Sequence, residues 1–267
     1  MTSFDSIASV YDQQFTDTRT GFLQRKLVYT HLDELLVKHG TKRVLELNCG
    51  TGADAIWLAQ KGCEVLATDI SPMMIKTAQK KAQSLDVATR KRLQFMPLAI
   101  EEIDQLKNQA PFDLVFSNFG GLNCVSQEGL KILSSNLKKL LLPNGRLVFI
   151  IMSRFCPWES MYFLAKRNWK QAWRRRNKSA VDAPLGDGVT IPTWYYSPKN
   201  MMNVFGSSFQ FSTQRPIGFF IPPSYLDPAF EHRPKTVELL WKMEKNCNHF
   251  NWLAPISDHF LIEFKLQ

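Results

Sequence analysis

The sequence predicts an α/β fold with a doubly wound, mainly parallel sheet, and three observations predict it. A short apolar run at residues 44–47 ends in a glycine turn at residues 50–52, and a helix-compatible stretch follows. A second apolar run, at residues 65–69, ends in an acid. Strand-like and helix-like segments then alternate as far as Met152, as they do where crossover helices join parallel strands.

The elements follow from local signals. A helical stripe at 21–38 precedes the first strand and is expected to cover the sheet edge. Gly62 is a plausible helix stop, and Ser71 followed by Pro72 is typical of a helix start. Residues 207–220 are expected to pair with the final strand as a hairpin. The predicted strands are 43–47, 64–69, 93–96, 111–118, 146–152 and 259–266, and the main helices are 21–38, 53–61, 72–85 and 127–142.

Length and composition favour one large domain. The 267 residues are 45% hydrophobic and carry a net charge of +9, with no run of about 18 apolar residues that would span a membrane. The N-terminus lacks the basic and apolar pattern of a secretory signal, so a soluble, cytoplasmic protein is expected. The five cysteines are scattered without metal-ligand spacing, so we expect reduced thiols and no metal.

The glycine turn indicates a nucleotide-cofactor site. Asp69 ends the second strand nineteen positions after Gly50, about the spacing of ~20 at which an acid reaches ribose hydroxyls. A dinucleotide fingerprint would need a third glycine where Ala55 stands, so NAD is disfavoured. The alternative role for Asp69 is to cap the following helix.

The order of motifs over residues 1–152 resembles the class I S-adenosylmethionine-dependent methyltransferases, and within them the small-molecule type 11 enzymes. Their first motif is an acid followed by G-x-G-x-G, and Glu46, Gly50 and Gly52 match it, with Asn48 at the first glycine. Asn is tolerated there because it enters left-handed backbone conformations more readily than most residues. The resemblance implies a seven-stranded Rossmann-like sheet, S-adenosyl-L-methionine as cofactor, and methyl transfer.

The resemblance also implies roles for individual residues. The first motif would surround the methionine moiety, and Asp69 would accept hydrogen bonds from the ribose. Ile70 and Met73 would flank the adenine. The loop after the fourth strand would border the transferred methyl. At the third strand the family's usual acid is replaced by Ala99, so backbone groups there would read the adenine, with Glu101 as a shifted alternative. The cofactor residues so implied are Glu46, Asn48, Cys49, Gly50, Gly52, Asp69, Ile70, Met73, Ala99, Ile100, Ser117, Asn118 and Phe119.

Methyl transfer from a sulfonium requires the nucleophile to be held in line and water to be excluded, so neither a metal nor a covalent residue is needed. Tyr11 is the candidate for closing over the methyl, because the resembling family has its Tyr-Asp segment there; the alternative is a capping aromatic. His259 is the candidate base, with a structural histidine as the alternative. Asn123, Cys124 and Arg154 follow strands four and five and are expected in the acceptor pocket.

Residues 153–206 are expected to form a lid insertion. Aromatic side chains at helical spacing, among them Trp158 and Tyr162, share a predicted helix with a basic cluster that contains no acid. A second cover at 222–256 brings Tyr225, so an apolar, aromatic roof over the acceptor is predicted. The basic residues of the helix are Lys166, Arg167, Lys170, Arg174, Arg175, Arg176 and Lys178.

Three interpretations of the basic helix stay open: a solvated outer face, a peripheral contact with an anionic membrane through residues 158–178, and a contact with RNA phosphates. The predicted organisation is a single domain, with a cofactor core at 1–152, the lid, and C-terminal hairpin strands at 207–267. The predicted function is methylation of an oxygen or nitrogen atom in a small, bulky, aromatic or lipid-like acceptor. The alternatives are a catalytically silent binding or regulatory protein and an RNA methyltransferase, although nucleic acid is the less favoured partner.

Overall fold

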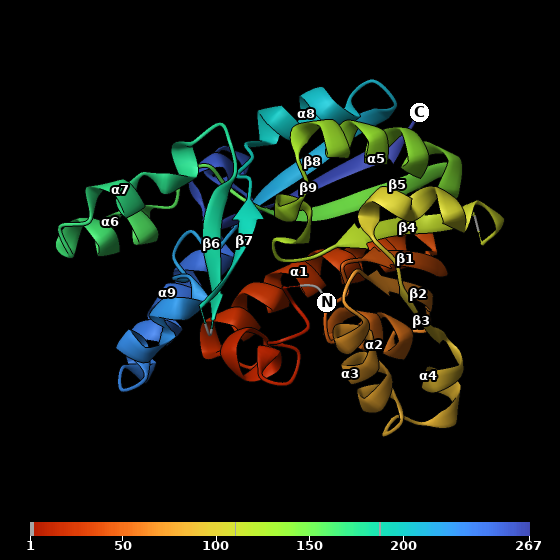
Figure 1. The fold of residues 1–267 in the computed structure, drawn as a ribbon, viewed down its shortest axis with the longest axis horizontal. Helices are drawn as coiled ribbons and strands as arrows, with labels where there is room; N and C mark the ends of the chain where they lie inside the picture. The colour runs from red at the N-terminus through yellow and green to blue at the C-terminus, as the bar shows by residue number, and fades with distance from the viewer. Residues whose placement is uncertain (1–2, 110, 187) are drawn as a thin grey trace.

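A computed structural model describes residues 3–109, 111–186 and 188–267. Its centre is a seven-stranded sheet in the order β3-β2-β1-β4-β5-β9-β8 (Figure 1). The first five strands run parallel, and β9 lies antiparallel between β5 and β8. The strands are β1 Arg43–Leu47, β2 Glu64–Asp69, β3 Leu93–Pro97, β4 Phe112–Ser117, β5 Leu141–Met152, β8 Phe209–Ile217 and β9 His259–Leu266. This confirms the doubly wound, mostly parallel sheet and the C-terminal hairpin.

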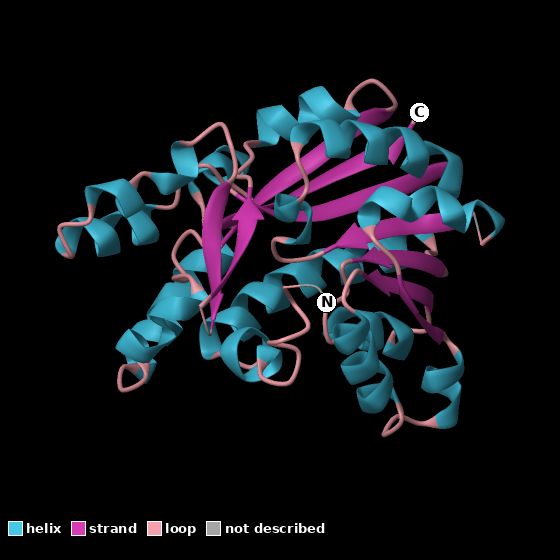
Figure 2. Ribbon diagram, in the orientation of Figure 1, coloured by secondary structure: helices cyan, strands magenta, loops and turns pink. Residues whose placement is uncertain are grey.

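Helices cover both faces of the sheet (Figure 2). The α-helices are α1 Arg19–His39, α2 Ala53–Gln60, α3 Pro72–Ala82, α4 Val87–Lys91, α5 Gln127–Leu140, α6 Pro157–Ala165, α7 Trp169–Ala172, α8 Pro198–Phe205 and α9 Pro234–Cys247. Shorter turns are η1 Asp12–Thr16, η2 Ile100–Asn108, η3 Gly121–Cys124, η4 Arg174–Arg176, η5 Ser224–Phe230 and η6 Asn251–Ile256. Among the described residues, no helix combines the length and apolar character needed to cross a membrane.

The alternation of side chains along each strand makes two cores. Val44 of β1 packs on one face with α1 and α2, while its neighbour Leu45 packs on the other with α5 and α8. Helix α1 contacts the edge strand β8, where Arg215 pairs with Glu34 at 3.2 Å, as expected for a helix that covers the sheet edge. Its Val28 and Leu32 belong to the same apolar core as Val44.

The insertion after β5 is not one long amphipathic helix. The left-handed backbone at Arg167, with φ of 54°, separates α6 from α7, and η4 follows. Figure 1 shows α6 and α7 projecting from the left edge of the molecule. The next segment forms a hairpin that sequence reasoning did not predict, with strands β6 Val181–Gly186 and β7 Val189–Thr193. We call α6, α7 and η4 the arm, and β6–β7 the small hairpin.

Candidate active site

A cavity of about 970 Å³ opens at the carboxyl ends of the central strands. Ligands bind at this edge in open α/β sheets. Its walls come from segments far apart in the sequence: the N-terminal residues, the loops after β1, β2 and β4, the arm, the small hairpin, and the start of β9. The cavity therefore has a floor made by the sheet and a roof made by the insertions.

The loop after β1 has left-handed backbone at Asn48, Gly50 and Gly52, with φ of 47°, 53° and 78°. Asn48 adopts this conformation and also uses its side chain, because its Oδ1 accepts a hydrogen bond from Ser117 Oγ at 2.9 Å and its Nδ2 donates to the Asn118 carbonyl. A Cβ on Gly121 would lie 1.9 Å from the Asn48 side chain. The asparagine at the first glycine position is thus accommodated by a glycine elsewhere.

Asp69 fixes this loop at the end of β2. Its Oδ2 accepts a hydrogen bond from the Gly50 N–H, and its Oδ1 accepts one from the Ser71 N–H, both at 2.8 Å. Burial raises the pKa of the Asp69 carboxyl, although the two backbone donors oppose that shift. Ser71, not Asp69, caps α3, because its hydroxyl accepts from the Met74 N–H at 3.1 Å. Asp69 is therefore free of the capping role and lines the cavity.

The N-terminal segment covers the glycine loop. Asp12 accepts a hydrogen bond from the Thr51 hydroxyl at 2.6 Å, and Asp5 accepts one from the Ser71 hydroxyl at 2.6 Å. Tyr11 lines the cavity and lies near Gly50, and its ring packs on Phe15 with centroids 5.0 Å apart. Burial raises the pKa of Tyr11 to about 12, so its phenol is protonated at neutral pH.

A buried polar cluster from α1 and α2 supports the loop after β4. Asp54 pairs with Arg25 at 2.9 Å, accepts from the Tyr29 hydroxyl at 2.7 Å, and accepts from Asn118 Nδ2 at 3.0 Å. Arg25 also lies over the Phe119 ring, 5.2 Å from its centroid. Sequence reasoning missed this cluster; the spacing of Arg25 and Tyr29, four residues apart on one helix, was its only signal.

Beyond the glycine loop, at the other end of the cavity, lie four largely buried charged side chains, two positive and two negative. Arg174 forms a two-pronged pair with Glu159, with both nitrogen–oxygen distances at 2.9 Å. Arg175 bridges Glu159 at 2.9 Å and Asp258 at 2.8 Å. Burial alone would raise the pKa of Glu159 and Asp258, but the neighbouring cations outweigh it and lower both. We call these four residues the acceptor-end cluster.

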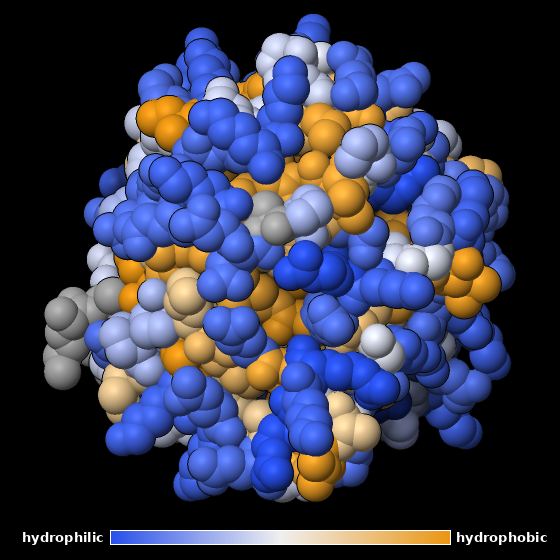
Figure 3. Space-filling view, turned by 90° about the vertical axis from the view of Figure 1, so that its right-hand side faces the viewer, coloured by the Kyte–Doolittle hydropathy of each residue, from blue (hydrophilic) through white to orange (hydrophobic). Residues whose placement is uncertain are grey.

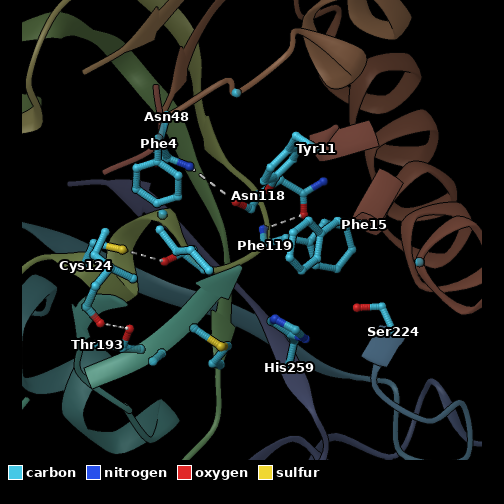
Figure 4. Close-up of a pocket in the computed structure, with 18 of the residues that line it drawn as sticks. Phe4, Tyr11, Phe15, Asn48, Asn118, Phe119, Cys124, Thr193, Ser224 and His259 are labelled. Atoms are coloured by element: carbon cyan, nitrogen blue, oxygen red, sulfur yellow. Dashed lines mark hydrogen bonds between the residues drawn. The ribbon is translucent and has the colours of Figure 1, made fainter. Parts of the chain in front are cut away.

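His259 stands between this cluster and the loop after β4. Its Nδ1 lies 3.1 Å from Asp258 Oδ2, and its ring meets the Phe119 ring edge-on, with centroids 5.2 Å apart. Figure 4 shows His259 inside the cavity beneath Phe119 and Phe15. Nδ1 is enclosed and faces the Asp258 carboxylate. Because His259 lines the cavity, its ring can contact a ligand there.

Comparisons with known proteins agree with this architecture. Residues 44–145 match a family model described as "Methyltransferase domain". This central part of the chain is therefore similar to methyltransferase domains. The methyltransferase CcbJ from Streptomyces caelestis has a similar structure, with a TM-score of 0.64, 15% identity, and coverage of 100% of this chain and 98% of that one. At that identity the likeness concerns the fold.

Two curated relatives are methyltransferases named for very different acceptors. The tRNA 5-carboxymethoxyuridine methyltransferase of Escherichia coli K12 is 30% identical over 115 residues, which are 42% of this chain and 43% of that protein. The malonyl-[acyl-carrier protein] O-methyltransferase of Enterobacter lignolyticus is 31% identical over 132 residues, 49% of this chain and 44% of that one. The chain thus spans less than half the length of either relative.

The cavity gathers most of the expected cofactor residues. The exceptions do not line it: Glu46 lies buried within β1, Gly52 packs on Ala78 where a Cβ would meet it at 2.7 Å, Ser117 is held by Asn48, and Met73 is 43% exposed. Ala99 also lies outside the lining, whereas Glu101 belongs to it. Those on the cavity wall are Asn48, Cys49, Gly50, Asp69, Ile70, Ile100, Asn118 and Phe119.

The residues expected in the acceptor pocket also fall into two groups, those that line the cavity and those that do not. Cys124, Tyr162 and Tyr225 line the cavity, as do both catalytic candidates. The other three expectations are corrected, because those side chains bind backbone groups and do not line the cavity. Asn123 exchanges hydrogen bonds with Met152 and Trp194, Arg154 donates to the Arg176 carbonyl, and Trp158 Nε1 donates to the Phe219 carbonyl at 3.0 Å.

Sequence reasoning also missed part of the roof. Leu185 and Ile191 of the small hairpin, and Tyr195 just after it, form a wall of the cavity. Arg174 and Arg175 had been assigned to an exposed basic face, yet they point inward because buried acids pair with them. No group of three or more His, Cys, Asp or Glu side chains within the described ranges is placed to hold a metal ion.

Proposed function

We propose that this protein transfers a methyl group from S-adenosylmethionine to a small organic acceptor, at an oxygen in preference to a nitrogen. One observation carries the proposal: a single cavity reaches from Asp69 and the glycine loop to His259 and the acceptor-end cluster. A donor and an acceptor can therefore meet inside one enclosed space, which methyl transfer by in-line displacement requires.

The residues present fit the donor. A carboxylate offers about four acceptor sites, and Asp69 uses one on each oxygen for backbone N–H groups, so sites remain for ribose hydroxyls. Ile70 and Ile100 supply apolar sides for a base, and the left-handed loop brings backbone within reach of the methionine end. When bound, S-adenosylmethionine supplies an electrophilic methyl carbon.

The chain's own residues would orient the acceptor, exclude water from the reacting groups and supply a base. Tyr11 and Phe119 close the region beside the glycine loop and exclude water from it. His259 Nε2 would take the proton from an acceptor hydroxyl, while Asp258 beside Nδ1 favours the proton on that nitrogen. An oxygen acceptor is preferred because a neutral hydroxyl needs such a base, whereas an amine can lose its proton to solvent.

The acceptor-end cluster narrows the acceptor further. Its two cations and two anions already pair with one another, so it leaves no uncompensated charge for a strongly ionic acceptor. The remaining wall is apolar or aromatic, with Leu185, Ile191, Tyr162 and Tyr195. We propose a hydroxyl on a bulky, mainly apolar body, such as a phenol or enol.

Binding of the cofactor is the direct test. Titration calorimetry with S-adenosylmethionine and S-adenosylhomocysteine should detect both, and Asp69→Asn should weaken both by about 10-fold to 100-fold, because hydrogen bonds to a charged group contribute about 1.5–3 kcal/mol. Asp33→Asn, which changes a half-exposed carboxylate on α1, should bind like the original protein. Absence of binding to either ligand at millimolar concentration would leave a silent binding protein as the better description.

The acceptor is then found by screening. A library of phenols, enols, amines, carboxylic acids and an unmodified tRNA, read by release of S-adenosylhomocysteine, separates the small-molecule proposal from RNA methylation. Turnover with hydroxyl acceptors supports the proposal. Turnover with tRNA alone would contradict it.

A further inference from the structure

The arm carries an exposed surface that the cavity does not use. Trp169 is 67% exposed, and Met161 and Trp173 are also exposed. Large apolar side chains that face water in a group mark a surface that is covered by a partner. The arm projects from the body of the protein (Figure 1), so this surface is accessible.

Positive charge accompanies these apolar side chains. From residue 160 to residue 181 the sequence has no Asp or Glu. Arg174 and Arg175 are turned inward, so they do not contribute, but five other cations are exposed. Arg176 lies over the Trp173 ring at 4.5 Å, which places a cation directly on an exposed aromatic. The exposed cations of the arm and the segment after it are Lys166, Arg167, Lys170, Arg176 and Lys178.

We propose that the arm docks on an anionic lipid surface. Tryptophan with lysine and arginine is the composition of interfacial segments, in which the ring enters the headgroup region and the cations attract acidic lipids. Charge complementarity selects this partner, because no acidic side chain between residues 160 and 181 opposes the exposed cations. RNA is less suitable, since the two central arginines of the basic cluster are held in ion pairs and cannot reach phosphates.

The side of the arm that lines the cavity and the side that is exposed would then serve different functions. Tyr162, Phe163, Arg174 and Arg175 line the cavity from within, while Trp169 and Lys170 face outward. Docking the arm would place the roof of the cavity next to the lipid. The docking proposal stands on the arm's own exposure and charge, so it holds or fails independently of methyl transfer.

Vesicle binding tests the inference. The full-length protein should co-sediment with vesicles of phosphatidylcholine and phosphatidylserine but only weakly with phosphatidylcholine alone. Trp169→Ser with Lys170→Glu should weaken binding to the mixed vesicles by on the order of tenfold or more, because a reversed lysine changes the charge by two and each charge near the surface contributes about 1 kcal/mol. Added salt should weaken binding of the unaltered protein as well.

A matched control lies at the other end of the molecule. Val87→Ser with Lys91→Glu changes an apolar and a basic side chain on α4, both exposed, and Figure 1 places α4 far from the arm. Hydrophilic side chains cover most of the face seen in Figure 3, which is turned away from the arm, with apolar ones gathered toward its centre. The variant with Val87→Ser and Lys91→Glu should bind vesicles like the unaltered protein. An equal loss of vesicle binding in both variants would overturn the proposal. So would a protein that binds tRNA and not vesicles, if altering the arm abolishes the tRNA binding. Unchanged thermal midpoints show that the variants are folded.

Discussion

Arg175→Met is expected to lower the free energy of unfolding by about 3–5 kcal/mol, because it removes one partner from a buried ion network. Arg175 is 6% exposed and contacts both Glu159 and Asp258. Without it, the buried Asp258 carboxylate loses its guanidinium partner. Urea unfolding followed by circular dichroism measures the change.

Arg176→Met is the matched control. Arg176 is the next residue in η4, but it is exposed and lies over the Trp173 and Phe155 rings, so its loss should cost about 1 kcal/mol or less. Similar destabilisation by both changes would mean that the acceptor-end cluster does not act as a buried network.

The destabilisation by Arg175→Met should also depend on pH. Because the folded pKa values of Asp258 and Glu159 are lowered, their contribution is present above the unfolded values, about 4, and is lost as the pH falls through the folded values. The difference between the unaltered protein and the variant should therefore be largest near neutral pH and shrink below about pH 4. A difference that grows on acidification would contradict the ion-pair explanation.

His259→Gln is expected to lower kcat for a hydroxyl acceptor by about 10²-fold to 10⁴-fold, the usual contribution of a positioned general base. Glutamine keeps a side-chain donor for Asp258, but it has no nitrogen that can take up a proton. The affinity for S-adenosylmethionine should stay the same, because His259 lies at the acceptor side of Phe119. Single-turnover rates with the acceptor found by screening measure the effect.

A second histidine distinguishes a base from a structural residue. His249→Gln, at an exposed histidine after α9, should leave the rate unchanged. A variant that retains the rate, or that loses cofactor binding together with it, would contradict the catalytic role.

Much of the sheet was predictable because the signals are local. The bounds of β1, β2 and β9 agree with the expectation to the residue, since apolar runs ended by glycine, an acid or a turn define strands without reference to the rest of the chain. The small hairpin was missed because Pro184 and Pro192 interrupt the strand pattern. Its stability comes from pairing across the turn, which no single stretch reveals.

The lid shows where periodicity misleads. Helical spacing from Trp158 to Lys178 predicted one helix with arginines outside, but the chain breaks at Arg167 and turns Arg174 and Arg175 inward. Glu159 and Asp258 attract them, and Asp258 lies 83 residues away from Arg175 in the chain. A periodicity analysis counts neighbours on one helix and cannot include such a partner.

The sequence by itself determined the sheet, the glycine loop and Asp69, because each depends on the order of residues within a few dozen positions. That Asn48 can replace the first glycine of the motif was also predictable, since asparagine adopts left-handed backbone conformations more readily than most residues. Only the tertiary structure decided which side chains face the acceptor. Arg25, Tyr195, Arg174 and His259 reach one cavity from four distant segments, and long-range packing and charge pairing set that arrangement.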